Sequence, residues 1–168
     1  MEKFCVLVAP TYLLTVNPDA PVDRRKSAPD MVTDCAELFR QGANGDSISL
    51  SMYRNREIVQ PGHKYLLLLQ GKHARGIISS GLISSIIGPD KFYYQPNKSG
   101  FFVNVCPDLF VDPYTNPERR LDIQILIKRW PIHFENHPRP WIARSSGQLL
   151  PADLAHQIST AFIRQANT

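Results

Sequence analysis

The sequence predicts an α+β domain in which a mixed sheet curls into a small barrel. About six or seven segments have the alternating or short apolar pattern of strands, and only two segments, one early and one late, have helical periodicity. These segments do not alternate as βαβαβ, which disfavours a doubly wound parallel sheet. The 168 residues contain no repeat or linker, so we expect one domain over residues 1–168.

The first third of the chain predicts two strands, a helix and a third strand. Residues 4–9 and 12–16 are short apolar runs that end at prolines. Asp30 can cap a helix over residues 30–41, because apolar side chains then recur at helical spacing up to Gly42. Residues 47–52 alternate strictly between serines and the apolar side chains Ile48, Leu50 and Met52. This alternation predicts a half-buried strand.

Residues 60–85 predict a central hairpin with a basic tip. Pro61-Gly62 is a turn signal, and residues 65–69 form a continuous apolar run typical of a strand buried on both faces. Residues 71–75 interrupt this run with basic side chains, and residues 76–85 then mix apolar with small side chains on both faces. The glycines of this second strand leave room for a close approach of backbone or of a flat ligand.

The last third predicts two strands and a helix. Residues 101–106 form one strand, and residues 121–130 form another because Leu121, Ile123, Ile125 and Ile127 alternate with polar side chains. Residues 131–140 contain three prolines and are expected to be irregular. Pro151 can open a final helix over residues 151–165.

Composition limits the classes of function. The net charge of +4 and pI of about 9.1 permit a polyanionic partner without requiring one. No apolar run approaches the roughly 20 residues that span a bilayer, and the N-terminus lacks a signal-peptide cleavage pattern. We therefore expect a cytoplasmic protein with no membrane partner.

The sequence contains no recognisable catalytic or cofactor motif. Glycine-rich phosphate loops, the nucleophile elbow and the H-E-x-x-H zinc motif are all absent. The three cysteines have neither zinc nor redox spacing, and the prolines around His133 and His137 disfavour the helix on which that spacing could bind a metal. We expect a binding module rather than an enzyme, with no metal and no cofactor.

Cations and aromatic side chains occur together in the predicted loops. This combination suits phosphate contacts with stacking on an exposed base, and it does not suit a recognition helix in the major groove. Solvated cations beside core aromatics would give the same pattern. The predicted contacts to a nucleic-acid backbone are Arg24, Arg25, Arg54, Arg56, Lys72, His73 and Arg75.

Three stretches, in order, resemble the PUA-like, EVE-type recognition domain at the N-terminus of bacterial HNH restriction endonucleases that attack modified DNA. They are residues 12–18 (YLLTVNP), residues 58–85 with their P-G turn and L-L-L-Q-G and R-G-I runs, and S-S-G at 145–147 followed by Leu150-Pro151. The middle stretch is the most specific. The family has a tryptophan after the threonine of the first stretch, where this chain has Val16. The family also has a W-S-x-G motif in the strand before the P-G turn, where this chain has Leu50-Ser51 without the tryptophan.

The resemblance implies a PUA-like pseudo-barrel of about five to seven mixed strands flanked by helices. It also implies a pocket for one base flipped out of duplex DNA, most often 5-methylcytosine or 5-hydroxymethylcytosine, as the reader of a modification-dependent restriction system. The cysteines and histidines of an HNH nuclease are absent, so a nuclease would be a separate domain or subunit. An RNA-binding PUA-like module remains an alternative, as does a small enzyme or small-molecule binder that uses the barrel cleft.

The pocket is expected between the first strand, the strand at 47–52 and the central hairpin, where the matched stretches converge. Serines on the outer face of a strand can hydrogen-bond a base edge, and an aromatic ring can replace the missing tryptophans. The predicted pocket residues are Tyr12, Ser49, Ser51, Tyr65, Gln70, Gly71 and Trp141.

Overall fold

The computed structural model describes residues 8–18, 35–71, 73–91, 99–135 and 146–168. Its centre is a seven-stranded sheet with the path β2-β5-β4-β3-β1-β7, and β6 pairs with β4 beside this path. The strands are β1 (Thr11–Val16), β2 (Ile48–Ser51), β3 (Lys64–Leu69), β4 (Gly76–Lys91), β5 (Ser99–Phe110), β6 (Leu121–Asp122) and β7 (Gln148–Leu149). β1 and β3 are parallel and the other pairs are antiparallel, so the predicted mixed sheet is confirmed.

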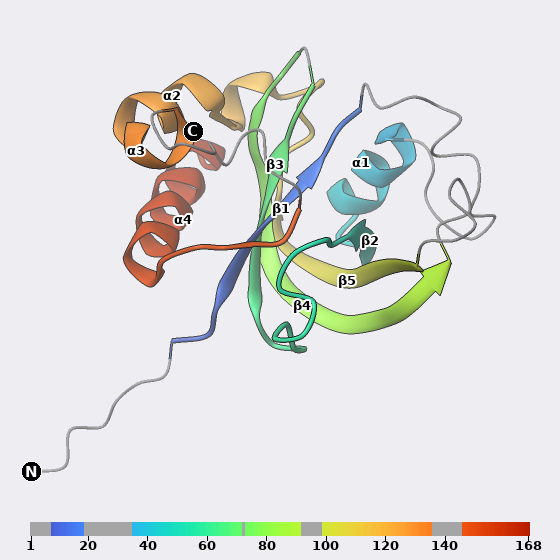
Figure 1. Ribbon diagram of the computed structural model, residues 1–168. Helices are drawn as coiled ribbons and strands as arrows, with labels where there is room; N and C mark the ends of the chain where they lie inside the picture. The colour runs from blue at the N-terminus through green and yellow to red at the C-terminus, as the bar shows by residue number, and fades with distance from the viewer. Residues whose placement is uncertain (1–7, 19–34, 72, 92–98, 136–145) are drawn as a thin grey trace, which may run out of the picture.

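Helices lie on both sides of this sheet. Figure 1 shows α2 (Ile123–Arg129), α3 (Pro131–Phe134) and α4 (Ala152–Ala166) together on one side, and α1 (Cys35–Ala43) on the other, inside the curl of β4 and β5. A three-residue 3₁₀ turn, η2 (Pro117–Arg119), precedes β6. The α+β class with a curled sheet and flanking helices is thereby confirmed.

The central hairpin divides two hydrophobic cores by the alternation of its strands. Leu66 and Leu68 of β3 pack with Leu13 against the layer of α2, α3 and α4. Their neighbours Tyr65, Leu67 and Leu69 pack on the side of α1. All five residues from Tyr65 to Leu69 are buried, which confirms the prediction of a strand covered on both faces. β1 and β3 therefore separate the two hydrophobic cores and contribute side chains to each of them.

The predicted strand over residues 121–130 is wrong beyond its first two residues. Residues 123–129 form α2, whose N-cap Asp122 accepts a hydrogen bond from the Gln124 amide at 2.8 Å. Ile123, Leu126 and Trp130, spaced by three and four residues, are the buried side chains of this segment. The same residues satisfy both a strand and a helix period, and the capping aspartate together with the core beneath selects the helix.

The proline-rich stretch after α2 also contains structure that was not predicted. Pro131 occupies the first turn of α3, where its missing N–H leaves no helical hydrogen bond unmade, and Phe134 is fully buried. The predicted C-terminal helix is confirmed as α4. The described part of the predicted early helix is α1.

Candidate nucleic-acid interface

The curled sheet is closed by a junction between two segments that are far apart in sequence. We call residues 52–55, which follow β2, and residues 146–147, which precede β7, the closing junction. The amides of Tyr53 and Arg54 both donate to the carbonyl oxygen of Ser146, at 3.0 and 3.1 Å, and the Asn55 side chain donates to the Gly147 carbonyl at 2.8 Å. The segment after one edge strand is therefore fixed to the segment before the opposite edge strand.

The junction is also tied to β1. The amide of Gly147 donates to the Leu13 carbonyl at 2.9 Å, and the amide of Thr15 donates to the Ser146 hydroxyl at 3.1 Å. Ser146 is only 2% exposed, so its hydroxyl is a buried acceptor rather than a group open to solvent. These hydrogen bonds attach residues 53–55, through Ser146 and Gly147, to the middle of β1.

Gly147 is required by this geometry for two separate reasons. Its φ angle of +102° lies in the region that disfavours side chains, and a Cβ placed there would lie 2.5 Å from the Arg54 carbonyl oxygen and 2.8 Å from Cγ of Met52. Asn55 is itself left-handed, with a φ of +57°, a conformation that asparagine tolerates better than most residues.

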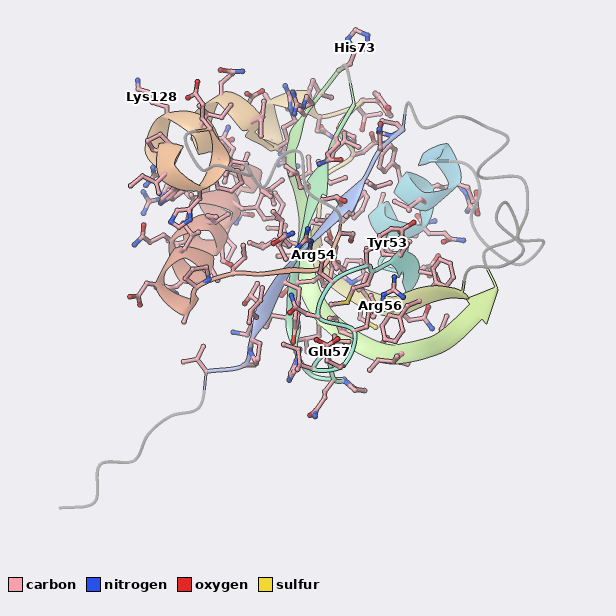
Figure 2. The ribbon with its side chains drawn as sticks, viewed as in Figure 1. Tyr53, Arg54, Arg56, Glu57, His73 and Lys128 are labelled. Atoms are coloured by element: carbon pink, nitrogen blue, oxygen red, sulfur yellow. The ribbon has the colours of Figure 1, made fainter. Side chains whose placement is uncertain are left out.

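At the junction lie an exposed aromatic ring, an exposed arginine and a half-buried arginine. The Tyr53 side chain is 40% exposed, and the Arg56 guanidinium lies over its ring at 5.7 Å from the centroid while its Nε donates to the Tyr53 carbonyl at 3.0 Å. Figure 2 shows Tyr53, Arg54, Arg56 and Glu57 on this one face of the molecule. An exposed ring flanked by arginines on a fixed loop can stack on a base while the cations contact phosphate.

The two predicted serines have different environments. Ser49 donates to Oδ1 of Asn104 at 2.5 Å, and Asn104 in turn donates to Ser85 at 3.0 Å, so Ser49 belongs to a polar row across β2, β5 and β4. Ser51 is half-buried at the last position of β2, directly before the closing junction. Ser51 is therefore the predicted pocket serine that lies nearest to Tyr53 along the chain.

The two predicted tyrosines are core side chains rather than stacking surfaces. Tyr12 is fully buried, its ring stacks on His63 at 5.7 Å between centroids, and its hydroxyl and Nδ1 of His63 are 3.1 Å apart. Tyr65 is 1% exposed and bonds to Ser79 at 2.8 Å. Burial of both rings leaves no face for a base, because the even positions of β1 and the odd positions of β3 point into the core beside α1. In this structure neither tyrosine presents an exposed ring face, so their predicted stacking role stays a prediction.

Burial also perturbs both phenols. Desolvation raises the pKa of Tyr12, and the nearby carboxylate of Glu57 raises it further. Desolvation raises the pKa of Tyr65 strongly, although the hydrogen bond with Ser79 acts in the opposite direction. Both phenols are therefore neutral hydrogen-bonding groups at physiological pH.

Among the predicted residues of the hairpin tip, His73 lies away from Tyr53, Arg54 and Arg56 (Figure 2). Gln70 follows β3, and its backbone N–H donates to the Val16 carbonyl at 2.8 Å. Gly71 adopts a φ of +114°. His73 is exposed at the far end of the hairpin, as Figure 2 shows, and Arg75 is half-buried at the start of β4. The structure therefore places Arg54 and Arg56 on one surface and His73 on another.

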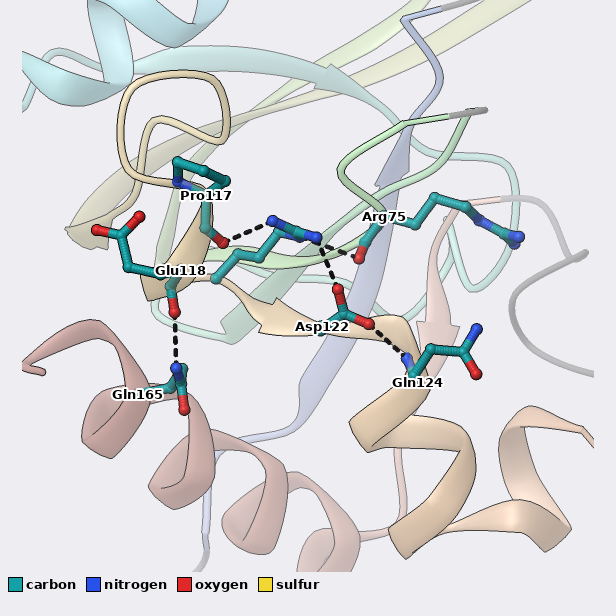
Figure 3. Close-up of polar contacts among 7 residues, drawn as sticks. Arg75, Pro117, Glu118, Asp122, Gln124 and Gln165 are labelled. Carbon is teal, nitrogen blue, oxygen red and sulfur yellow. Dashed lines mark hydrogen bonds and ion pairs between the residues drawn. The ribbon is translucent and has the colours of Figure 1, made fainter.

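A cluster of contacts made by Arg120, which we call the clasp, lies near the tip of the hairpin. Arg120 donates to the carbonyls of Arg75 and Pro117, at 3.4 and 2.6 Å, and forms an ion pair with Asp122 at 2.6 Å. Figure 3 shows these contacts beside the Gln165 side chain, which donates to the Glu118 carbonyl at 2.6 Å. The clasp connects the hairpin, η2 and the start of α2.

Four of the predicted site residues, Arg24, Arg25, Lys72 and Trp141, lie outside the described residues. Three residues of the closing junction, Asn55, Ser146 and Gly147, and the exposed Tyr53 were not predicted as site residues. The run Tyr53-Arg54-Asn55-Arg56, in which one aromatic ring is followed by two arginines in a predicted loop, was the available signal for Tyr53. Among the described residues no group of histidine, cysteine and acidic side chains could hold a metal ion, and no described helix is long and apolar enough to cross a membrane.

Comparison with solved structures finds likeness to YTH domains. The chain is similar to the YTH domain of CPSF4 from Toxoplasma in apo form, with 10% identity and a TM-score of 0.49 over 93% of this chain and 88% of that one. It is also similar to the YTH domain of Zygosaccharomyces rouxii MRB1 in complex with N6-methyladenosine RNA, with 14% identity and a TM-score of 0.46 over 93% and 90%. The Pho92 YTH domain in complex with m6A matches with 11% identity and a TM-score of 0.43 over 92% and 83%.

No family model and no curated protein sequence matches the chain. At these TM-scores and identities the similarity is limited to the backbone fold and carries no argument about function. The case for function therefore depends on the residues of the closing junction and of the surface around Tyr53.

Proposed function

We propose that this protein is a non-catalytic reader of a modified base in nucleic acid. The observation that carries the proposal is the exposed Tyr53 ring under the Arg56 guanidinium, beside Arg54, on a loop fixed by the closing junction. A ring of this kind can stack on an extruded base, a contact of about 1–3 kcal/mol. The flanking cations would bind phosphates on either side of it.

Discrimination between a modified and an unmodified base needs a shaped niche, because one buried methyl adds only about 0.8 kcal/mol. Ser51, half-buried beside the junction, and the fixed backbone at residues 53–55 are the polar groups that we assign to the base edge. We propose 5-methylcytosine or 5-hydroxymethylcytosine in duplex DNA as the ligand, with any nuclease activity supplied by a separate domain or subunit.

Fluorescence anisotropy with matched oligonucleotides tests the proposal. The probes are a plain duplex, the same duplex with 5-methylcytosine or 5-hydroxymethylcytosine, and single-stranded RNA of the same sequence with and without N6-methyladenosine, the base named for two of the similar structures. Tighter binding of the cytosine-modified duplex supports the proposal as stated. Preference for modified RNA would move the ligand class to RNA, and equal binding of all probes would refute base reading.

Variants then locate the site. Tyr53→Ala should lower affinity for the preferred probe by about tenfold, the loss of one stacking contact. Ser51→Leu should remove the preference for the modified base while leaving weak, salt-sensitive binding. Arg164→Gln is the matched control, because Arg164 is exposed on α4, on the opposite side of the sheet from α1. Unchanged binding by both site variants would show that the pocket lies elsewhere.

A further inference from the structure

A cavity outside the closing junction lies between the sheet and α4. It is a groove of about 130 Å³, large enough for several water molecules, lined by the start of β1, the start of β3 and the first two turns of α4. Its polar lining comes from Thr11, Lys64, His156 and Ser159. None of these residues belongs to the closing junction or to the surface around Tyr53.

Strand register explains why polar groups meet here. Thr11 and Lys64 are paired across the parallel β1–β3 ladder, so their side chains project from the same face of the sheet. Two residues further along each strand, Leu13 and Leu66 project from that same face into the core under α4. The apolar row thus ends in a hydroxyl and an ammonium group where the groove opens.

The charges of the groove are of one sign. Lys64 is exposed and forms no ion pair with any described residue, and none of the described carboxylates lines the groove. Asp153, in the first turn of α4, is exposed and lies outside the lining. An anion would therefore meet a cation without a competing acidic side chain in the groove.

Two further features supply hydrogen-bond donors. Thr11 is 8% exposed, and its hydroxyl has no hydrogen-bond partner among the described residues. The hydroxyl oxygen is not fully buried, so it is accessible from the groove that Thr11 lines. The N-cap residue of α4, Pro151, provides no side-chain hydrogen bond to the first turn, and Ala152 at the first helical position lines the groove. Uncapped amides at the start of a 15-residue helix favour an anion.

We propose that this groove binds a phosphate group. Lys64 provides the charge, the Thr11 and Ser159 hydroxyls donate hydrogen bonds to phosphate oxygens, and the start of α4 adds its positive electrostatic potential. The phosphate belongs either to the backbone of the nucleic acid or to a separate small phosphorylated molecule. The chemistry of recognition is the same for both.

Titration of the full chain with inorganic phosphate tests the site without any nucleic acid. At constant ionic strength set with sodium chloride, the amide NMR signals of Thr11, Ala152 and His156 should shift and saturate. Lys64→Gln should weaken phosphate binding by about tenfold, as expected for loss of one charge-assisted hydrogen bond. Thr11→Val, which keeps the shape of the side chain, should weaken it by about fivefold. Lys128→Gln, an exposed lysine on α2, is the matched control and should have no effect.

Shifts that fail to saturate, or that are the same in wild type and Lys64→Gln, would mean an adventitious ion only and would overturn the proposal. The source of the phosphate is then read from anisotropy with nucleic acid. If it is a backbone phosphate, Lys64→Gln lowers the slope of log affinity against log salt by about one. If it is a separate molecule, the slope is unchanged while the phosphate titration still depends on Lys64. Failure of nucleic-acid binding altogether would refute the proposed reader and leave the phosphate site standing.

Discussion

The side chain of Asn55 donates a hydrogen bond to the carbonyl oxygen of Gly147, 92 residues away in the sequence. This contact, with the pair of amides bonded to the Ser146 carbonyl, closes the curled sheet next to the exposed Tyr53 ring. The rigidity of the proposed reading surface therefore depends on the closing junction.

Gly147→Ala should open the junction. The added Cβ would meet the Arg54 carbonyl oxygen at 2.5 Å and would require a left-handed backbone, so we expect a loss of more than about 2 kcal/mol in the free energy of unfolding. Gly45→Ala is the matched control, because Gly45 has a φ of +77° with no atom within 4 Å, and it should lose only about 1 kcal/mol. Urea denaturation measures both. Equal losses of unfolding free energy in the two variants would show that the contact between the added Cβ and the Arg54 carbonyl does not destabilise the protein.

Gly42→Ala tests packing against helix propensity. Alanine in a helix is favoured over glycine by about 1 kcal/mol, so propensity alone predicts stabilisation of α1. A Cβ at Gly42 would instead clash with the ring of Phe110, which belongs to β5 and packs at the edge of the core beside α1. We expect net destabilisation, and Phe110→Leu in the same chain should recover part of it. A more stable single variant in thermal unfolding would contradict the packing described here.

Tyr65 should make stability fall at high pH. Burial raises the pKa of this phenol, so between the unfolded value of about 10 and the folded value the native state holds a proton that the unfolded state has lost. The free energy of unfolding should therefore be unaffected by this group below about pH 9 and should decrease as the pH rises above about 10.

Tyr65→Phe should flatten that decrease. At neutral pH it should cost about 1 kcal/mol, because the bond to Ser79 is lost while Ser79 still donates to the Leu109 carbonyl at 3.0 Å. Urea denaturation at pH 8 and pH 10.5 separates the two effects, with Tyr114→Phe as control because that side chain is 58% exposed. The same pH slope in wild type and Tyr65→Phe would show that this phenol does not cause the decrease.

Arg54 and Arg56 should each contribute one phosphate contact. Substitution of either by glutamine should lower the slope of log affinity against log salt by about one, and the double variant by about two. His73→Gln should change this slope less, since His73 lies at the hairpin tip, away from the closing junction. A larger effect of His73→Gln than of Arg56→Gln would move the interface to the tip.

The sequence by itself determined the parts of the fold that depend on short-range pattern. The strict alternation of residues 47–52 predicted β2, the apolar run of residues 65–69 predicted a doubly covered β3, and the turn signals around them predicted the central hairpin. Each depends on periodicity and turn chemistry within about ten residues of chain, which operate before any long-range contact forms. The same local signals placed Arg54 and Arg56 in a polar loop.

Only the tertiary structure decided which of these residues meet. Residues 123–129 satisfy both periodicities, and the cap at Asp122 with the core under α2 selected the helix. Tyr12 and Tyr65 have the side chains of a stacking wall, yet their positions on β1 and β3 point them into a core. The closing junction joins residues 92 positions apart, and a contact at that separation leaves no trace in local pattern, because it depends on how far the sheet curls before its edges meet.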